Sequence, residues 1–125
     1  MNSLLVEAGE KWVLPFARIE KIAEATTLAP YAFPLEELSG LLPFDGALIP
    51  VWRPREFRRA GSIVVVYHGE EGTAGLHVNQ VMGLGRTQCR EPAHGETVEL
   101  DDGQHGRWFA IDELERRHSA ALPEE

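Results

Sequence analysis

The stretch Gly40-Leu41-Leu42-Pro43-Phe44-Asp45-Gly46-Ala47-Leu48-Ile49-Pro50-Val51 carries more information on the fold than any other part of this sequence. It predicts a turn at Gly40, a tight turn at Asp45-Gly46, and then a strand that enters a proline at Pro50. Glycine is used where φ must be positive or where backbones approach closely, and a proline within a strand indicates an edge or a bulge. The segment contains no histidine or thiol for chemistry. It therefore predicts a docking surface rather than a catalytic site.

The composition is that of one ordinary globular domain. Of the 125 residues, 43% are hydrophobic and 26% are charged, which disfavours bulk disorder. The formal net charge is −8, from 20 acidic against 12 basic residues, whereas binding to phosphates of nucleic acid needs clustered Lys and Arg. The one basic cluster, residues 53–59, could bind an acidic partner or a phosphate, but a solvated connection is the simpler interpretation. We therefore expect no nucleic-acid partner.

Cysteine usage and hydropathy favour a cytoplasmic protein. The single cysteine, Cys89, permits no intrachain disulfide and no cysteine-based zinc site. The apolar run at the N-terminus has no basic start and is interrupted by Glu7, unlike a signal peptide. No run approaches the ~18 apolar residues that a transmembrane helix needs, so we expect no membrane insertion.

Short strands separated by glycine and polar turns predict small β-barrels rather than a βαβ sheet. Residues 62–68 form the most apolar run, and their continuous β-branched sequence predicts burial on both faces. The other expected strands are a hairpin of residues 4–8 and 11–15, followed by residues 47–52, 73–84, 97–100 and 107–111.

The remaining segments give weaker or local signals. Residues 16–25 fit either one helical face or a strand with a bulge, and residues 26–34 predict a loop. Residues 34–39 predict one helical turn that ends at Gly40. Asp112, followed by Glu115, has the spacing of a helix N-cap, which predicts a short C-terminal helix.

We find no constellation that predicts catalysis, a metal site or a cofactor. His68 and His77 lie on neighbouring expected strands and could hold a metal with Glu70 or Glu71, but ordinary strand and turn roles are the simpler interpretation. Cys89 could pair with His94 as nucleophile and base, but no orienting third group is evident. The expected core is instead apolar and consists of Leu14, Val64, Val66, Leu76, Val78, Val81 and Ile111.

The order of these motifs resembles the CheW-like domain, an adaptor module of bacterial chemosensory arrays. The resemblance covers about residues 4–114, and residues 115–125 form a C-terminal helix and tail, so that residues 1–125 make a single domain. Its most specific part is the signature G-v-i-n-l-R-G-x-i-i-P-V-x-D-L, which is matched by residues 40–54. A "V-x-E-I" element is matched by residues 19–22, and "G-l-x-V-D-x-V" is matched by residues 75–81.

The resemblance implies a mainly all-β fold of two small five-stranded, SH3-like barrels packed around a shared core, with a short C-terminal helix. It also implies a non-catalytic adaptor that couples a CheA-type histidine kinase to chemoreceptor tips. The positions that match the family's receptor-facing groove, and that we expect to bind a partner, are Ile19, Lys21, Gly40, Asp45 and Gly46.

Three charged positions depart from the family pattern. Lys21 replaces the family's Glu, Asp45 its Arg, and Arg53 its Asp. Since a reversed charge weakens binding to the old partner and favours a partner of opposite charge, we expect a diverged partner specificity.

The passage of residues 85–106 is polar and shorter than in the family, which predicts an abbreviated barrel or an open sheet edge. Such an edge could pair in a homodimer or with a domain of the kinase. Two alternatives to the adaptor stay open. One is a stand-alone regulator that competes with a normal adaptor, and the other is a small metal- or ligand-dependent enzyme using His68 and His77.

Overall fold

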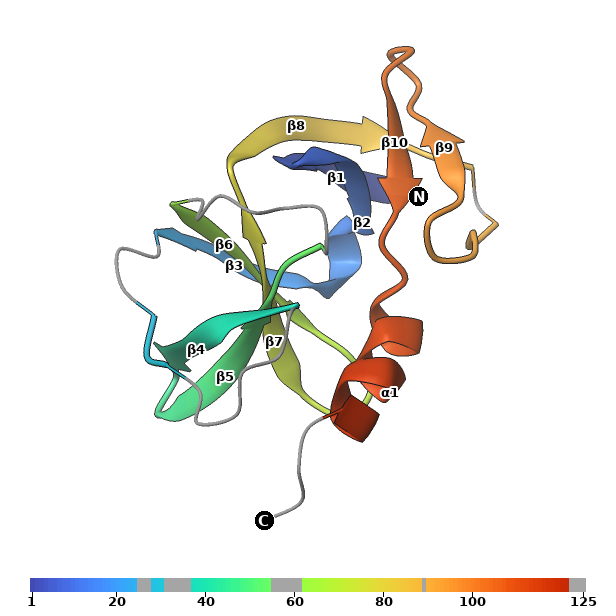
Figure 1. The fold of residues 1–125 in the computed structure, drawn as a ribbon. Helices are drawn as coiled ribbons and strands as arrows, with labels where there is room; N and C mark the ends of the chain where they lie inside the picture. Colours follow the sequence, from blue (N-terminus) through green and yellow to red (C-terminus); the bar gives the residue numbers. More distant parts are fainter. Residues whose placement is uncertain (25–27, 31–36, 55–61, 89, 122–125) are drawn as a thin grey trace.

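The computed structural model describes residues 1–24, 28–30, 37–54, 62–88 and 90–121. The chain forms two five-stranded sheets, each curled into a small barrel, with a C-terminal helix beside them (Figure 1). Barrel 1 contains β1 (Asn2–Ala8), β2 (Glu10–Pro15), β8 (Gln80–Arg86), β9 (Thr97–Glu99) and β10 (His105–Trp108). Barrel 2 contains β3 (Ile19–Glu24), β4 (Leu38–Phe44), β5 (Ala47–Trp52), β6 (Ile63–His68) and β7 (Thr73–Val78). The predicted mainly all-β fold of two barrels is confirmed.

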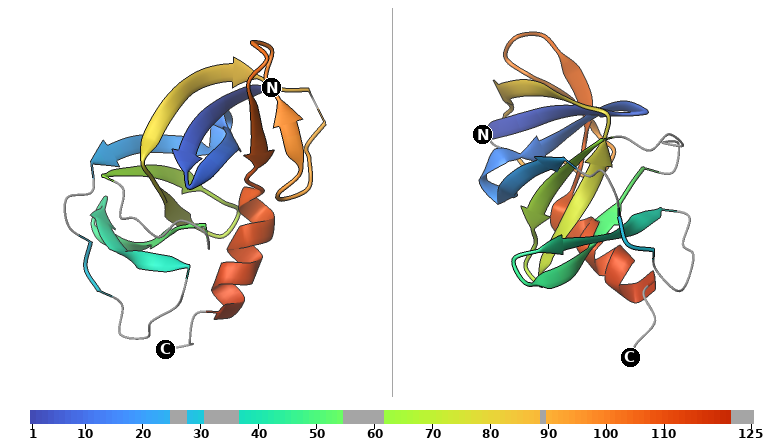
Figure 2. Two further views of the ribbon diagram at one scale, coloured as in Figure 1. Left: turned by 45° about the horizontal axis from the view of Figure 1, so that its top comes forward. Right: turned by 90° about the vertical axis from the view of Figure 1, so that its left-hand side faces the viewer.

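The two barrels have the same sequence of strand pairings. Barrel 1 has the order β8-β1-β2-β10-β9 and barrel 2 the order β3-β6-β7-β5-β4. In each order the pairings are antiparallel, antiparallel, parallel and antiparallel. The two further views in Figure 2 show the barrels stacked, with β1 and β2 of one packed over β6 and β7 of the other.

Three apolar clusters account for this architecture. The shared core between the barrels consists of Leu4, Val6, Ala8, Trp12, Leu14, Val65, Tyr67, Leu76, Val78, Phe109, Ile111 and Leu114. The interior of barrel 1 holds Leu5, Val13, Leu100, Trp108 and Ala110, and that of barrel 2 holds Ile49, Val51, Val64 and Val66. Alternate residues of β1, β2 and β6 thus enter different clusters, because side chains on a strand alternate between its faces.

This arrangement confirms the predicted burial of β6 on both faces and extends it to β1. All the predicted core residues lie in these clusters except Val81, which is only partly buried against the shared core. Val81 belongs to an edge strand, β8, where one flank has no neighbouring strand among the described residues to cover it.

The first hairpin forms as predicted, and the following segment resolves the ambiguity at residues 16–25. Leu4 pairs with Leu14 in the β1–β2 hairpin. A short 3-10 helix, η1 (Phe16–Arg18), follows, and then β3, which carries a bulge between Ile19 and Lys21. The strand-with-bulge alternative is therefore correct for residues 19–24, whereas residues 16–18 form the 3-10 helix.

Several predictions of local structure need correction. Leu38 and Ser39 begin β4 instead of ending a helical turn, and the rest of that expected turn, apart from Glu37, lies outside the described residues. The single strand expected over residues 73–84 is two strands in different sheets, β7 and β8. The chain crosses between them at Asn79, whose backbone N–H donates to the Glu7 carbonyl and whose side chain donates to the Glu7 carboxylate.

The last strand ends earlier than predicted, and the helix begins earlier. β10 ends at Trp108, and α1 spans Ile111–Ala121, so Ile111 is helical. Asp112 therefore lies in the first turn of α1 and is not its N-cap. Its carboxylate instead accepts two hydrogen bonds from Arg18, at 2.8 and 2.9 Å, and this fork fixes α1 to η1.

Residues 85–106 contribute the shortest strands of barrel 1. β9 has three residues, and one side of the barrel is completed by a backbone hydrogen bond from Asp101 to the Arg86 carbonyl at 3.0 Å. A turn at Asp101-Asp102-Gly103 joins β9 to β10. No helix among the described residues has the length and apolar character needed to cross a membrane.

Candidate functional site

The structure places Ile19 and Lys21 on β3, an edge strand of barrel 2. Ile19 lies opposite Tyr67 and packs against the shared core, whereas Lys21 lies past the bulge and is exposed. Glu20 is the extra residue of the bulge, and its carboxylate lies 3.3 Å from Nδ1 of His68. A bulge of this kind changes the direction of a side chain at a sheet edge. β3 thus presents a lysine beside a carboxylate–histidine contact.

Asp45 and Gly46 form the tip of the β4–β5 hairpin. Their φ angles are 53° and 82°, and Phe44 pairs with Ala47 directly before and after them. Two consecutive residues with positive φ are typical of the tight hairpin turn for which Asp-Gly is a preferred sequence. The predicted tight turn is confirmed, and both residues are exposed.

Gly40 differs from the other predicted contact residues because it is buried. It has a φ of 155°, and a Cβ atom at this position would lie 2.8 Å from Leu28 Cβ and 2.9 Å from the Ala29 carbonyl oxygen. Ala29 and Leu41 exchange two backbone hydrogen bonds, which attach residues 28–30 to the outer edge of β4. The glycine therefore permits this close approach, and a strand with a bulge replaces the turn predicted there.

The two prolines of the hairpin limit where further strands can pair. Leu41 directs its backbone N–H and carbonyl to Ala29, so Pro43, two residues on, directs its nitrogen to the same outer edge and offers no donor there. Pro50 lies opposite Leu41 and directs its nitrogen toward β7, but the β5–β7 ladder begins only at Val51. Of the predicted edge or bulge, the edge is therefore wrong: Pro50 occupies an inner strand, one residue from the position opposite the β4 bulge, at a point where no ladder hydrogen bond is lost.

Two exposed apolar side chains belong to the same surfaces and were not singled out from the sequence. Ile22 on β3 is 45% exposed and Leu48 on β5 is 58% exposed. An apolar residue in a strand is normally assigned to the core, and no local pattern distinguishes an edge strand from an inner one. The sheet order, which the sequence does not show, is what exposes them.

These residues form two groups. Ile19, Lys21 and Ile22 lie on β3, and Asp45, Gly46 and Leu48 lie at the hairpin, while β3 and β4 occupy opposite ends of the strand order. The hairpin tip and the C-terminal end of β3 lie on the same side of barrel 2 in Figures 1 and 2. Gly40 is separated from the tip by the length of β4 and belongs to neither surface.

The residues considered for metal or enzyme chemistry do not converge. In the β6–β7 hairpin His68 pairs with Thr73, beside the turn, whereas His77 pairs with Val64, at the far end. His77 is buried and its Nδ1 lies 3.1 Å from the Ser39 hydroxyl. Cys89 lies outside the described residues, and those residues contain no group of three metal-ligating side chains.

The fold has a counterpart among solved structures. The crystal structure of the scaffolding protein TtCheW from Thermoanaerobacter tengcongensis matches with a TM-score of 0.74, over 90% of this chain and 86% of that chain. The chain has a CheW-like fold. Sequence identity is 16%, so the similarity concerns the fold. No protein-family model matches the sequence, and no curated protein matches it either.

The CheW-like fold explains why the motif order could be recognised despite low identity. The motifs that carried the resemblance fall at places where the fold restricts the residue type. These are the close approach at Gly40, the hairpin tip at Gly46, and Gly75, whose Cβ would lie 2.5 Å from Val64 Cγ1 in the interior of barrel 2. The charged residues between them lie on the surface and can change without altering the fold.

Proposed function

We propose that this protein is a non-catalytic, cytoplasmic adaptor of a chemosensory pathway, which couples a CheA-type histidine kinase to chemoreceptors or to a diverged partner. The observation that carries the proposal is the CheW-like arrangement of two barrels around one apolar core, over 90% of the chain. The separation of His68 from His77 further favours a binding role over the metal-dependent alternative.

The partner surface in this proposal consists of Ile19, Lys21 and Ile22 on β3 together with Asp45, Gly46 and Leu48 at the hairpin tip. Each group places one charge beside an exposed apolar side chain. Protein interfaces commonly combine an apolar contact with a polar rim that selects the partner. Gly40 supports this surface indirectly, since it fixes the position of β4.

The charges of Lys21 and Asp45 then select the partner. The lysine would pair with an acidic group and the aspartate with a basic group, which is opposite to the family pattern at both positions. Asp45 suits a charge test because asparagine also tolerates the positive φ of the turn. Asp45→Asn therefore removes the charge without changing the backbone requirement.

The test measures binding of the purified protein to a purified CheA-type kinase and to a receptor signalling fragment from the same genome. We expect Lys21→Gln and Asp45→Asn each to weaken binding to one of them by about fivefold to tenfold, as expected for about 1 kcal/mol at a charged rim. Lys11→Gln is the matched control, because Lys11 is the other lysine of the chain and is exposed on β2.

Binding to neither protein would overturn the proposal. Equal effects of Lys21→Gln and Lys11→Gln would leave the adaptor role but remove β3 from the interface. Binding to the kinase or to the receptor, but never to both together, would favour a regulator that competes with a normal adaptor. A molecular mass that rises with protein concentration in sedimentation would show that the protein forms a homodimer.

A further inference from the structure

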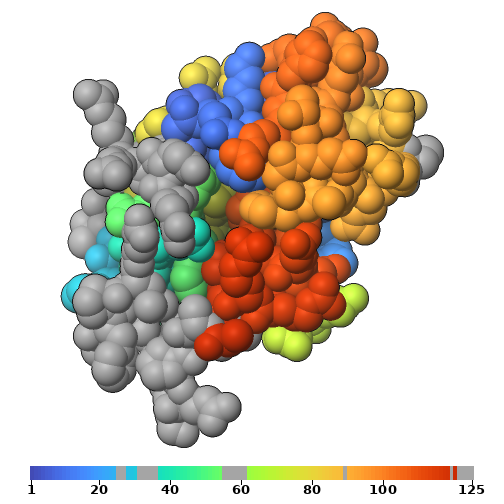
Figure 3. Space-filling view, turned by 45° about the vertical axis from the view of Figure 1, so that its right-hand side comes forward, coloured from blue at the N-terminus to red at the C-terminus, as the bar shows by residue number. Residues whose placement is uncertain are grey.

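A cavity of about 320 Å³ lies where the two barrels meet α1, away from the proposed partner surface. Trp12 comes from β2, Trp52 from the end of β5, Phe109 from the link after β10, and Arg117 and His118 from α1. Figure 3 shows the face on which the red surface of α1 adjoins the orange surface of barrel 1. None of the residues proposed for partner binding lines the cavity. It needs a separate explanation.

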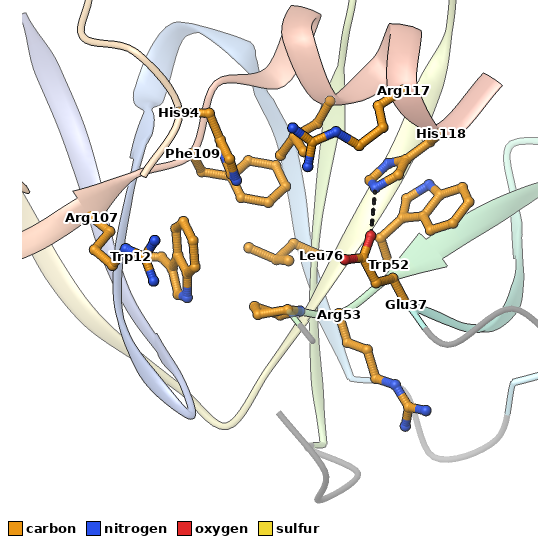
Figure 4. Close-up of a pocket in the computed structure, with 12 residues that line it drawn as sticks. Trp12, Glu37, Trp52, Arg53, Leu76, His94, Arg107, Phe109, Arg117 and His118 are labelled. Atoms are coloured by element: carbon orange, nitrogen blue, oxygen red, sulfur yellow. Dashed lines mark ion pairs between the residues drawn. The ribbon is translucent and has the colours of Figure 1, made fainter. Parts of the chain in front are cut away.

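Five aromatic rings contribute to the walls of the cavity, those of Trp12, Trp52, His94, Phe109 and His118. Trp12 and Trp52 stand on opposite sides of it in Figure 4, and their exposed fractions are 4% and 3%. Phe109 lies between them, edge-on to Trp12 at a centroid distance of 6.0 Å. The Trp12 indole N–H is buried and has no hydrogen-bond partner within the described part of the chain. Aromatic walls with a few convergent polar groups are typical of small-molecule sites.

The rim of the cavity is cationic on a protein whose formal net charge is −8. Arg53, Arg107 and Arg117 line it, against Glu37 as the single carboxylate among the described lining residues. Arg107 is engaged by Glu10 at 2.9 Å and lies over the Trp12 ring at 5.0 Å. Arg117 makes no ion pair with any described residue. A guanidinium with donors left over at a concave site is suited to bind a carboxylate or phosphate.

The two histidines of the cavity supply rings but no charge at neutral pH. Burial, with Arg117 nearby, lowers the pKa of His94, and burial, Arg117 and His94 lower that of His118 to about 4. His118 stacks on Trp52 at 3.7 Å, and His94 stacks on Trp12 at 5.3 Å. The positive potential therefore comes from the arginines and persists across the physiological pH range.

We propose that this cavity binds a small organic anion with a planar aromatic body. The ring would pack between the aromatic walls, and the anionic group would lie at the rim beside Arg117 and Arg53. The volume is at the lower end of the roughly 300–1,000 Å³ of small-molecule pockets, which suits one or two fused rings and excludes a dinucleotide.

Phenyl phosphate is the probe for this proposal, because it combines an aromatic ring with an anionic group. Benzyl alcohol supplies a ring without the anionic group, and inorganic phosphate supplies the anionic group without a ring. Calorimetric titration of the full chain is expected to show saturable binding of phenyl phosphate, about tenfold tighter than either half, since ring and anion contribute together. A parallel titration with benzoate shows whether the cavity prefers a carboxylate or a phosphate. Binding of either compound supports the proposal that the ligand is a small aromatic anion.

Arg117→Gln is expected to weaken phenyl phosphate binding by about tenfold, the effect of losing one charge-assisted contact. Arg116→Gln is the matched control, because Arg116 is the preceding exposed residue of α1 and does not line the cavity. It should leave binding unchanged, as should Lys21→Gln on the partner surface. Thermal melting of each variant verifies that it is folded.

The proposal is overturned if neither phenyl phosphate nor benzoate binds more tightly than about 1 mM. It is also overturned if inorganic phosphate or benzyl alcohol binds as tightly as the better of the two aromatic anions, or if the two arginine variants lose equal affinity. The outcome is independent of the adaptor role, since that role is tested by binding of kinase and receptor.

Discussion

The two barrels have the same strand order but are built from the chain in different ways. Barrel 2 uses one continuous segment, from Ile19 to Val78, whereas barrel 1 combines the first fifteen residues with residues 80–108. If β8, β9, β10, β1 and β2 are taken in that order, they match β3 to β7 strand for strand. Barrel 1 is therefore interrupted between β10 and β1, which is the position equivalent to the connection from β5 to β6 in barrel 2.

The correspondence includes the position of a bulge. The bulge between β1 and β8 and the bulge between β6 and β3 occur in equivalent strand pairs. The strand order therefore does not depend on a continuous chain. Both barrels require only the same set of strand pairings. The paired strands β1–β2 and β6–β7 supply one layer each to the shared core.

The interiors of the barrels differ much more than their topology. Barrel 1 is filled by one large side chain, Trp108, which is fully buried among smaller residues. Barrel 2 is filled by β-branched residues and also contains the contact between His77 and Ser39. Equivalent topologies can thus be packed either by one dominant residue or by several of similar size. Substitutions within each barrel can test this difference.

The largest effect is expected from Trp108→Ala. It should lower the free energy of unfolding by about 3–5 kcal/mol, because the cavity cannot be filled by the small neighbours of Trp108. In barrel 2, Val66→Ala should cost about 2 kcal/mol, since its neighbours share the packing. Chemical denaturation of both variants measures the two losses.

Trp108→Phe serves as the control for the first substitution. It keeps an aromatic ring and removes an indole N–H that has no hydrogen-bond partner among the described residues. The free energy of unfolding should therefore fall clearly less than in Trp108→Ala. Equal losses for Trp108→Ala and Val66→Ala would contradict the idea that one residue dominates barrel 1.

A second test adds volume to barrel 2 instead of removing it from barrel 1. In Gly75→Ala the new Cβ would lie 2.5 Å from Val64 Cγ1 and 3.3 Å from Val51 Cγ2. We expect a loss of about 2–3 kcal/mol from overpacking, measured by denaturation. Gly72→Ala, where no atom lies within 4 Å, should change stability by less than about 0.5 kcal/mol.

The double variant with Val64→Ala identifies the cause of the loss. If the clash with Val64 is responsible, the two substitutions should cost less together than the sum of their separate costs. Strict additivity would show that Gly75 is needed for its backbone and not for the space beside it.

The sequence was sufficient to predict the local pairings of the fold, because these depend on patterns of neighbouring residues. The hairpin at residues 4–15, the tight turn at Asp45-Gly46 and the doubly buried β6 follow from turn chemistry and apolar runs. The break at Asn79 could not be predicted in the same way. Residues 73–84 read as one continuous strand, and the crossing depends on Glu7, which is distant in the sequence.

The candidate site was less predictable than the fold. The sequence groups Gly40 with the partner-binding residues, yet its burial depends on Leu28 and Ala29, which pack against it from another part of the chain. The aromatic cavity was missed for the same reason. Trp12, Trp52 and His118 are far apart in sequence and meet only because α1 packs across both barrels.

The smallest effect concerns the seam between the barrels, where acid should weaken the contact of α1 with barrel 2. The pKa of His118 is about 4 in the folded protein, mainly because of burial, and near its ordinary 6.5 when unfolded. The Glu37 carboxylate, 3.7 Å from Nε2, would favour the charged form, but burial and Arg117 outweigh it. His94 has a lowered pKa as well and acts in the same direction.

Because the unfolded chain binds a proton that folded His118 does not, stability should fall as the pH decreases from about 6.5 to about 4. The contribution is about 2 kcal/mol by the lower pH and is absent above pH 7, where His118 is neutral in both states. Urea denaturation at pH 7 and pH 4.5 measures it. His118→Phe, which keeps a ring against Trp52, should reduce this difference, whereas His105→Asn at an exposed position of β10 should not. An unchanged pH dependence in His118→Phe would place the acid-sensitive element within a barrel and not at the seam.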